Sequence, residues 1–586
     1  MAVEKLITQY IDTWTSALQT RSTAGRGRNG KIDLYGIKKL RELILELAVR
    51  GKLVPQDPND EPASELLKRI AAEKADLVKQ GKIKKQKPLP EISEDEKPFE
   101  LPAGWKWSSI QNLCLLENGD RSKNYPNKST LTETGVPFVN AGHLLNGKID
   151  EKEMTFIKES HFETLRSGKF LPGDILFCLR GSLGKSALVE NISGAIASSL
   201  VIVRVYPLVN NKYVHFYFDS PISYQFIKKY DNGTAQPNLA ANDLARFLIP
   251  VPPVDEQIRI LGKIDNLMSL CDKLEQQSLT SLDAHQQLVE TLLITLTDSQ
   301  NAEELAENWA RISQYFDTLF TTEASIDALK QTILQLAVMG KLVPQDPNDE
   351  PASELLKRIE QEKAQLVKEG KIKKQKPLPP VGDEEKPFAL PQGWVWVRLG
   401  DIGTISGGGT PSKNNKEYWS GDIPWVSPKD MKVDRISTAE LNISEQAVAN
   451  SSVRIIPSDS ILFVVRGMIL AHTFPVAINQ REVTINQDMK SISSCLFNMD
   501  FLLYLMKGVS RKILGLVDRS SHGTCKLISE KLFGLQIPLP PLSEQGRINS
   551  RIGELVLLCD TLKSRLQSAQ QTQLHLADAL TDAALN

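Results

Sequence analysis

The sequence predicts an α+β protein in which two sheet-containing domains alternate with duplicated helical regions. Three observations lead to this fold class. Residues 51–90 and 340–379 are identical at 36 of 40 positions, a proline-rich junction occurs twice in front of a helical pattern, and short apolar runs typical of strands lie between these repeats. A chain of 586 residues is long enough for about four domains.

Each 40-residue repeat follows a predicted helix and precedes a new domain. The helix is indicated by apolar residues spaced 3, 4 and 3 apart, which share one helical face. These residues are Ile37, Leu40, Ile44 and Leu47 in the first copy and Ile326, Leu329, Ile333 and Leu336 in the second. After each repeat, an L-P-x-G-W-x-W segment begins at Leu101 or Leu390; its proline and glycine stop a helix, and an aromatic-rich strand follows.

Long helices are predicted after the junctions at 252–260 and 540–548, which share the pattern P-P-x-x-E-Q-x-R-I. Beyond each junction, apolar residues recur at 4, 3, 4 and 3, the spacing of a coiled-coil seam. The predicted organisation is therefore an N-terminal helical region with a basic linker at 1–100, a first variable domain at 101–253, a central helical region with a basic linker at 254–390, a second variable domain at 391–541 and a C-terminal helical region at 542–586.

Charge is distributed unevenly between the domains and the helices. Residues 102–253 and 391–541 each contain 16 lysines and arginines against 13 aspartates and glutamates, so each domain carries +3, whereas the remaining residues carry 38 basic and 45 acidic side chains. Anionic ligands would therefore prefer the variable domains, which fits contact with nucleic acid. A charge of +3 is also common in proteins without that role.

Several classes of protein are disfavoured by the composition. The six cysteines are scattered without a C-x-x-C pair and the seven histidines lack metal-ligand spacing, so neither a disulfide framework nor a metal site is expected. The polar start and the absence of a long apolar run predict a cytoplasmic protein without a membrane segment.

No catalytic centre is recognisable. The segments 25–31 and 181–186 resemble phosphate-binding loops, but the first lacks a preceding strand and the second has only two residues between its glycines. No N-P-P-[FYW] segment typical of base-amino methylation is present. Binding is therefore the expected role, while a bifunctional enzyme with an unrecognised site and a tandem scaffold that binds two copies of one protein remain alternatives.

Two predicted strands, 173–180 and 457–466, deliver an arginine followed by glycine at a turn. Arg180 and Arg466 would either be surface arginines at β-turns or point at a phosphate or a guanine edge. The basic linkers 81–88 and 370–377 would contact a partner protein, act as solvated hinges or follow a DNA backbone, and nothing in the sequence separates these alternatives.

Over its whole length the chain resembles the specificity (S) subunits of type I restriction–modification systems. The paired junctions, the L-P-x-G-W-x-W segments and the two variable domains between duplicated helices carry this resemblance, and the repeated segment that begins at Gly51 and Gly340 is similar to the IB group. The segment 233–239 resembles the family's G-T-x-Q-x-N-[LI] pattern, whereas 523–527 lacks the Gln and Asn. The segment 409–429 resembles a family loop of which the first domain keeps only residues 136–140.

The resemblance implies a non-catalytic subunit that confers sequence specificity. Each variable domain would be an α/β target recognition domain with twisted sheets that reads one half of a split target in double-stranded DNA. Two long antiparallel coiled-coil helices would join the domains in a pseudo-twofold arrangement, set the spacer and dock two methyltransferase (M) subunits. Two motor-nuclease (R) subunits would complete the complex. This chain would hold no cofactor, since S-adenosylmethionine belongs to the M subunit, and ATP and magnesium to the R subunit.

These considerations give two sets of candidate residues. The candidate DNA contacts are Arg121, Lys123, Asn140, Arg180, Lys185, Gln236 and Asn238 in the first domain and Thr410, Ser412, Lys413, Lys429, Arg466 and His522 in the second. The residues expected to dock the M subunits are Ile260, Ile264, Leu267, Leu274, Ile548, Ile552, Leu555 and Leu562.

Overall fold

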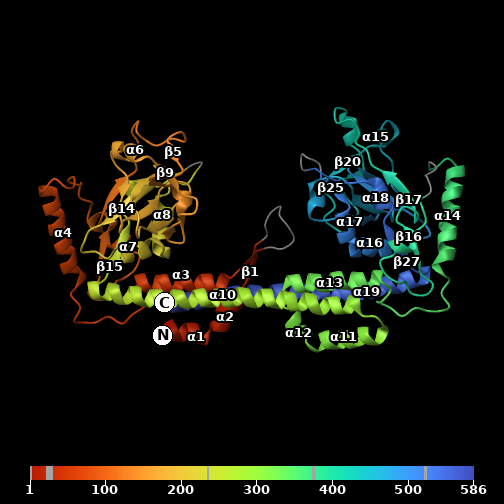
Figure 1. The fold of residues 1–586 in the computed structure, drawn as a ribbon, viewed down its shortest axis with the longest axis horizontal. Coiled ribbons are helices and arrows are strands. Elements are labelled where there is room, and N and C mark those ends of the chain that lie inside the picture. Colours follow the sequence, from red (N-terminus) through yellow and green to blue (C-terminus); the bar gives the residue numbers. More distant parts are fainter. Residues whose placement is uncertain (1–2, 22–30, 234–235, 373–377, 520–523, 586) are drawn as a thin grey trace. The chain divides into compact units, whose positions relative to one another are not determined.

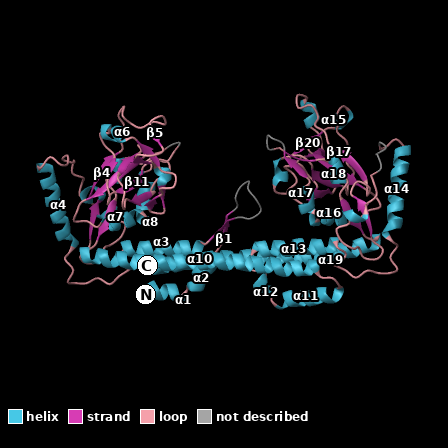
Figure 2. Ribbon diagram, viewed as in Figure 1, coloured by secondary structure: helices cyan, strands magenta, loops and turns pink. Residues whose placement is uncertain are grey.

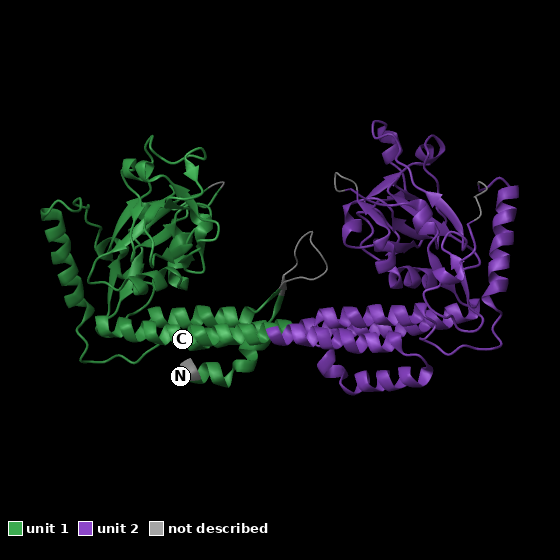
Figure 3. Cartoon of the chain, viewed as in Figure 1, with its two compact units in different colours: residues 1–19, 32–279, 570–586 green, residues 20–31, 280–569 purple. Residues whose placement is uncertain are grey.

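The structure, a computed structural model, describes residues 3–21, 31–233, 236–372, 378–519 and 524–585 (Figure 1). It divides into two compact units, unit 1 with residues 1–19, 32–279 and 570–586 and unit 2 with residues 20–31 and 280–569 (Figure 3). In each unit a sheet-rich domain lies on a bundle of helices (Figure 2). The predicted α+β fold class is confirmed. Among the described residues, no helix is long and apolar enough to cross a membrane.

The helical bundle of unit 1 is formed by α3 and by parts of two long helices. The helices of this unit outside the sheet-rich domain are α1 (Val3–Gln9), α2 (Ile11–Ser16), α3 (Tyr35–Val49), α4 (Ala63–Lys79), the first part of α10 (Val254–Asp298) and the last part of α19 (Leu542–Leu585). Of these, α4 lies against the domain, where Lys74 donates to the Gln111 carbonyl at 2.9 Å (Figure 1). Strand β1 (Gln19–Arg21) pairs with β2 (Lys31–Asp33). From α3, Arg41 donates to Asp272 of α10 at 2.6 Å, and the Tyr35 hydroxyl donates to Asp578 of α19 at 2.7 Å. Thus α3 ties the two long helices together.

Unit 2 repeats this bundle with α13 in the place of α3. Its helices are α11 (Ala302–Gln314), α12 (Phe316–Leu319), α13 (Glu323–Val338), α14 (Ala352–Lys368) and the remaining parts of α10 and α19. Lys563 of α19 contacts Asp327 of α13 at 3.1 Å, and Gln567 donates to Glu323 at 3.0 Å. Because residue numbers rise on α19 as they fall on α13, these two helices are antiparallel.

Most of the seam residues that we expected to dock a partner are instead buried within the chain. Ile260, Ile264, Leu267, Leu274, Ile548 and Ile552 are each at most 7% exposed, and Leu555 and Leu562 pack against the core of the unit 2 bundle. For the six buried side chains the expectation of docking was wrong, because an apolar seam does not reveal which helix covers it. Docking through the partly buried Leu555 and Leu562 stays a prediction. Here α3 and α13 lie in the same bundles as the long helices.

The domain of unit 1 contains two main sheets, one antiparallel and one mixed. One has the order β12-β11-β14-β4 and the other β10-β13-β6-β9-β5, in which only β13 and β6 are parallel. The strands are β3 (Lys106–Ser109), β4 (Cys114–Asn118), β5 (Leu131–Thr132), β6 (Val136–Val139), β7 (Leu144–Leu145), β8 (Lys148–Ile149), β9 (Thr155–Ile157), β10 (Lys169–Phe170), β11 (Ile175–Cys178), β12 (Ser186–Leu188), β13 (Gly194–Ile196), β14 (Leu200–Val205) and β15 (Leu248–Val251). The helices are α5 (Ile110–Leu113), α6 (Glu159–Thr164), α7 (Asn211–Phe218), α8 (Pro221–Tyr230) and α9 (Ala241–Leu244).

The domain of unit 2 has a corresponding arrangement. Its sheets have the orders β17-β24-β21-β22-β19 and β20-β18-β23. The strands are β16 (Val395–Arg398), β17 (Thr404–Gly407), β18 (Ile423–Val426), β19 (Arg435–Ile436), β20 (Leu441–Ile443), β21 (Ile461–Val464), β22 (Val476–Asn479), β23 (Thr484–Ile485), β24 (Met489–Ser493), β25 (Val517–Arg519), β26 (Cys525–Leu527) and β27 (Gln536–Leu539). The helices are α15 (Glu445–Ala449), α16 (Met499–Gly508), α17 (Ser510–Gly515) and α18 (Ser529–Phe533), and α16 packs on α13.

Each domain is closed by its first and last strands. In unit 1, β3 pairs with β15 and Trp107 lies opposite Pro250; in unit 2, β16 pairs with β27 and Trp396 lies opposite Pro538. The chain therefore leaves each domain beside the point where it entered. The P-P-x-x-E-Q-x-R-I junction follows directly, so the domain and the long helix meet at one place.

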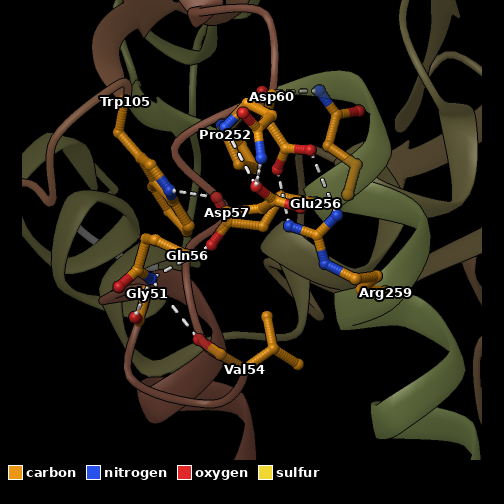
Figure 4. A network of polar contacts seen from close by, with 11 residues as sticks. Gly51, Val54, Gln56, Asp57, Asp60, Trp105, Pro252, Glu256 and Arg259 are labelled. Carbon is orange, nitrogen blue, oxygen red and sulfur yellow. Dashed lines mark hydrogen bonds and ion pairs between the residues drawn. The ribbon is translucent and has the colours of Figure 1, made fainter.

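A network of polar contacts around Glu256 holds this meeting point together (Figure 4). Glu256 is 1% exposed, and its carboxylate accepts hydrogen bonds from the Trp105 indole at 2.9 Å and from the Gln56 amide at 3.1 Å. Burial raises the pKa of Glu256, while these two hydrogen bonds oppose the rise. Arg259 binds Asp60 in a bidentate ion pair with a shorter contact of 2.5 Å. The duplicated segment thereby clamps the domain onto α10.

The same network recurs in unit 2 with matching residues. Glu544 accepts from Trp394 at 2.9 Å and from Gln345 at 3.1 Å, and Arg547 binds Asp349 at 2.6 Å. This intramolecular role accounts for the repetition of the Gln and Asp of the P-Q-D-P-N-D segment and of the E-Q-x-R pattern. Both patterns supply side chains to the clamp that joins the domain to its long helix.

We predict that Ile548→Ala lowers the free energy of unfolding of the isolated chain by about 2–5 kcal/mol, because it opens a cavity at a fully buried position. Leu557→Ala on the same helix is the control, since Leu557 is 67% exposed and its loss should change stability by no more than about 0.5 kcal/mol. Urea denaturation followed by circular dichroism measures both. Equal losses would contradict the burial of the seam.

We predict that Trp105→Phe costs about 1–3 kcal/mol of stability, because it leaves the buried Glu256 carboxylate without one of its donors. Trp394→Phe should cost about the same in unit 2. Trp107→Phe is the control and should cost less, because its indole donates at 3.3 Å to the backbone carbonyl of Phe99 rather than to a buried charge. Thermal or urea unfolding of the three variants tests the clamp.

Candidate nucleic-acid interface

In the first domain, two loops that carry candidate residues leave the sheet at the same edge. Strands β4 and β11 are both antiparallel to β14, so they run in the same direction. The last residue of β4, Asn118, lies opposite Val201, and the last residue of β11, Cys178, lies opposite Leu200. The loops that follow β4 and β11 therefore begin on either side of the start of β14.

Cationic side chains follow both strands at this edge. Arg121 and Lys123 are exposed on the loop after β4, and Arg180 and Lys185 are exposed on the turn after β11. Asp120 anchors the first loop, since its buried carboxylate accepts the backbone amide of Ser122 at 2.6 Å. Burial alone would raise the pKa of Asp120, but hydrogen bonds from backbone amides outweigh it and hold the pKa below its usual value.

Asn140 reaches the same edge from the second sheet. It follows β6, whose last residue is Val139. The Val139 carbonyl accepts the backbone amide of Ala197, and Ala197 lies three residues before the start of β14. The Asn140 side chain accepts the Gly142 amide at 2.7 Å and so caps a short 3-10 turn. Its carbonyl oxygen therefore has a structural task that the sequence did not indicate.

The second domain builds the same edge from the equivalent strands. Strands β17 and β21 are both antiparallel to β24, with Gly407 opposite Lys490 and Val464 opposite Met489. The loop 408–413 and the turn at Arg466 therefore leave the sheet beside the start of β24. Strand β18 brings the segment 427–430 to this edge, because Val426 accepts the amide of Asn486.

Two tryptophans hold the loop that carries Thr410, Ser412 and Lys413. The Trp425 indole donates to the Gly409 carbonyl at 2.9 Å, and the Trp419 indole donates to the Ser412 carbonyl at 3.2 Å. Thr410 donates to Gln487, while the side chains of Ser412 and Lys413 are exposed.

The two remaining described cations among the candidates of this edge, Lys429 and Arg466, each lie close to an acidic side chain. Lys429 is exposed and lies 3.8 Å from Glu440, and Arg466 binds Asp488 at 2.5 Å. The structure thus brings the described candidate residues on these loops to one sheet edge in each domain.

The loop after α8 in the first domain corresponds to the strand β26 in the second. Arg180 pairs through its backbone with Asn238, and Arg466 pairs in the same way with Lys526. Gly181 donates to the Pro237 carbonyl and Gly467 to the Cys525 carbonyl, each at 3.0 Å. The two segments are therefore equivalent, and Lys526, which we had not selected, occupies the position of Asn238. The offset of 288 that relates the two junctions also relates Leu239 to Leu527, and this was the signal in the sequence for the equivalence.

Some predictions fall partly or wholly outside the described residues. His522 lies outside them, as do residues 25–30 of the first phosphate-loop-like segment and residues 373–377 of the second basic linker. Gln236 is described and exposed. In the first linker, the Lys87 carbonyl accepts a hydrogen bond from Gln111 at 2.9 Å, so this end of the linker lies against the domain. Within the described ranges, no group of three or more His, Cys, Asp or Glu side chains is arranged to hold a metal ion.

We predict that Gly408→Ala destabilises the second domain by about 1–3 kcal/mol, because an added Cβ would lie 1.8 Å from the backbone oxygen of Asn486 and would push the loop 409–413 away from the edge. The adjacent Gly407→Ala is the matched control, since its Cβ would meet no atom within 4 Å. Urea denaturation measures both variants. Equal effects would show that the loop does not pack as described.

Comparison with known proteins places these domains in a family. Residues 102–284 and 391–570 each match the family described as "Type I restriction modification DNA specificity domain". The chain is 50% identical over the full length of both proteins to the type I restriction enzyme EcoAI specificity subunit and, equally, to the EcoEI specificity subunit, both from Escherichia coli. A crystal structure of the HsdS subunit from Thermoanaerobacter tengcongensis is 19% identical, with a TM-score of 0.40, and the match covers 84% of this chain and 98% of that one. The chain therefore belongs to the family of type I restriction–modification DNA specificity proteins.

Proposed function

We propose that this chain is the specificity subunit of a type I restriction–modification complex and that each of its two domains reads one half of a split DNA target. One observation carries the proposal: the DNA specificity domain occurs twice, and both copies expose cationic loops at the equivalent sheet edge. Lysines and arginines on these loops would neutralise phosphates, and polar side chains beside them would meet base edges.

The difference between the two edges supports two different half-sites. The first domain offers Arg121, Lys123, Asn140 and Gln236, whereas the second offers Ser412, Lys413 and Lys429 on loops of another sequence. Base choice depends on which donors and acceptors reach the groove, so two edges with different side chains would select different bases. The clamps around Glu256 and Glu544 are alike, so the domains would be presented in the same way.

The helical regions would set the spacer and dock two M subunits, with two R subunits completing the complex. S-adenosylmethionine would act in the M subunit, and ATP and magnesium in the R subunit. Since most of the seam leucines and isoleucines are buried, the docking surface would mainly use outward-facing residues. Leu288 of α10 and Leu576 of α19 support this, because they are related by the repeat offset and are 52% and 45% exposed.

We predict that the chain, purified together with its M subunit, methylates adenines within a split sequence that has a fixed unread gap. The measurement is single-molecule sequencing of random duplex DNA after treatment with the complex, and the M subunit alone is the control. A stable complex that methylates without sequence preference, or that assembles without any affinity for DNA, would contradict the proposal and favour a protein scaffold.

A further inference from the structure

Arg180 and Arg466 occupy the same place in two domains whose sequences differ. Arg180 lies just beyond β11 and Arg466 just beyond β21, and each is followed by a glycine with positive φ. The backbone of each is fixed by a bridge, to Asn238 in the first domain and to Lys526 in the second. Both side chains are exposed at the sheet edge described above.

Each guanidinium group is held by a single acceptor through its Nε atom. Nε of Arg180 donates to Asn238 Oδ1 at 3.1 Å, and Nε of Arg466 donates to Asp488 Oδ1 at 2.5 Å. In the part of the chain that the structure describes, no hydrogen bond is assigned to the terminal amino groups of either arginine. The acceptor thus fixes the guanidinium while its terminal edge stays available to a ligand.

The two acceptors come from different elements and are themselves held in place. Asn238, on the loop before α9, donates its side-chain amide to Asn232 at 2.8 Å and its backbone amide to Asp231 at 2.9 Å. Asp488, on the turn before β24, donates its backbone amide to Asn486 at 3.0 Å, and its carbonyl accepts the amides of Val465 and Arg466. The two domains therefore orient an arginine by unrelated contacts.

We propose that Arg180 and Arg466 each read one guanine, and that Asn238 and Asp488 are positioning residues that orient these arginines. The inference rests on the proposed function. The two terminal amino groups of an arginine match the O6 and N7 acceptors on the major-groove edge of guanine. A contact to phosphate needs only charge, and Asp488 offsets much of the charge of Arg466, so a base contact is favoured in the second domain.

The charges around the two turns support a common role. In the first domain, Arg180 with the neutral Asn238 carries one net positive charge. In the second domain, Asp488 cancels the charge of Arg466, and the exposed Lys526 at the position of Asn238 restores it. Counted over the arginine, its acceptor and the residue bridged to the arginine, each domain thus keeps one net positive charge, although the acceptor of the arginine differs.

The experiment measures how the complex of this chain with its M subunit methylates targets in which each base pair of either half-site is changed in turn. Arg180→Ala should reduce discrimination at one G·C pair of one half-site by about 5- to 150-fold. Asn238→Ala should reduce discrimination at the same pair by about 3- to 10-fold. Asn238→Asp keeps an acceptor for Nε of Arg180 and should retain the wild-type discrimination. Arg466→Ala, Asp488→Ala and Asp488→Asn should behave likewise at the other half-site.

Arg69→Ala and Arg358→Ala are matched controls, because these arginines pair with Glu61 and Glu350 outside the recognition edges. They should leave both half-sites unchanged. In each test variant, unchanged reading of the other half-site shows that the chain is folded. A uniform loss of methylation on all DNA would mark a phosphate contact and overturn the inference. Unchanged discrimination, loss of discrimination at both half-sites, or equal effects of Asn238→Ala and Asn238→Asp would also overturn it. A wild-type complex without a split target would instead overturn the proposed function.

Discussion

A buried carboxylate at each domain junction is the interaction on which the rest of the structure depends. Glu256 and Glu544 are each 1% exposed, and a charge or polar group in such a place must be satisfied by donors. The donors come from two separate segments: a tryptophan at the start of the domain and a glutamine of the duplicated repeat. The carboxylate itself is on the long helix. Three segments distant in sequence therefore meet at one point, where the domain is joined to the long helix.

This constraint separates what must stay the same from what can change. The clamp uses the same residue types in both units, including the ion pairs Arg259–Asp60 and Arg547–Asp349. The recognition edges lie on loops that follow β4 and β11, or β17 and β21, and take no part in the clamp. Their side chains can therefore differ without disturbing the junction. The unequal sequences of the two domains and the near-identity of the repeats follow from this division.

Local patterns in the sequence predicted the local structure, and long-range pairing explains what they missed. The Arg-Gly turns after residues 178 and 464, the aromatic strands at Trp107 and Trp396 and the long helices after the proline pairs lie where composition and spacing placed them. The seam residues, such as Ile260, were misassigned to a partner because spacing alone does not say whether α3 or another protein covers them. The gathering of Arg121 with Arg180 depends on the pairing of both β4 and β11 with β14, which no local pattern reveals. The roles of Asn238 and Asp488 required side-chain geometry.

Two interchangeable clamps hold two domains that each recognise one half-site independently of the other. The most direct measurement replaces residues 102–253 with a second copy of residues 391–541, keeping both junctions, and maps the methylation target of the resulting complex. The account predicts a split target in which both halves are the half-site of the second domain, with the original gap, because each clamp meets the exchanged segment through matching groups, a tryptophan indole and a proline carbonyl. An unchanged target, or a folded complex that reads only one half-site, would contradict it.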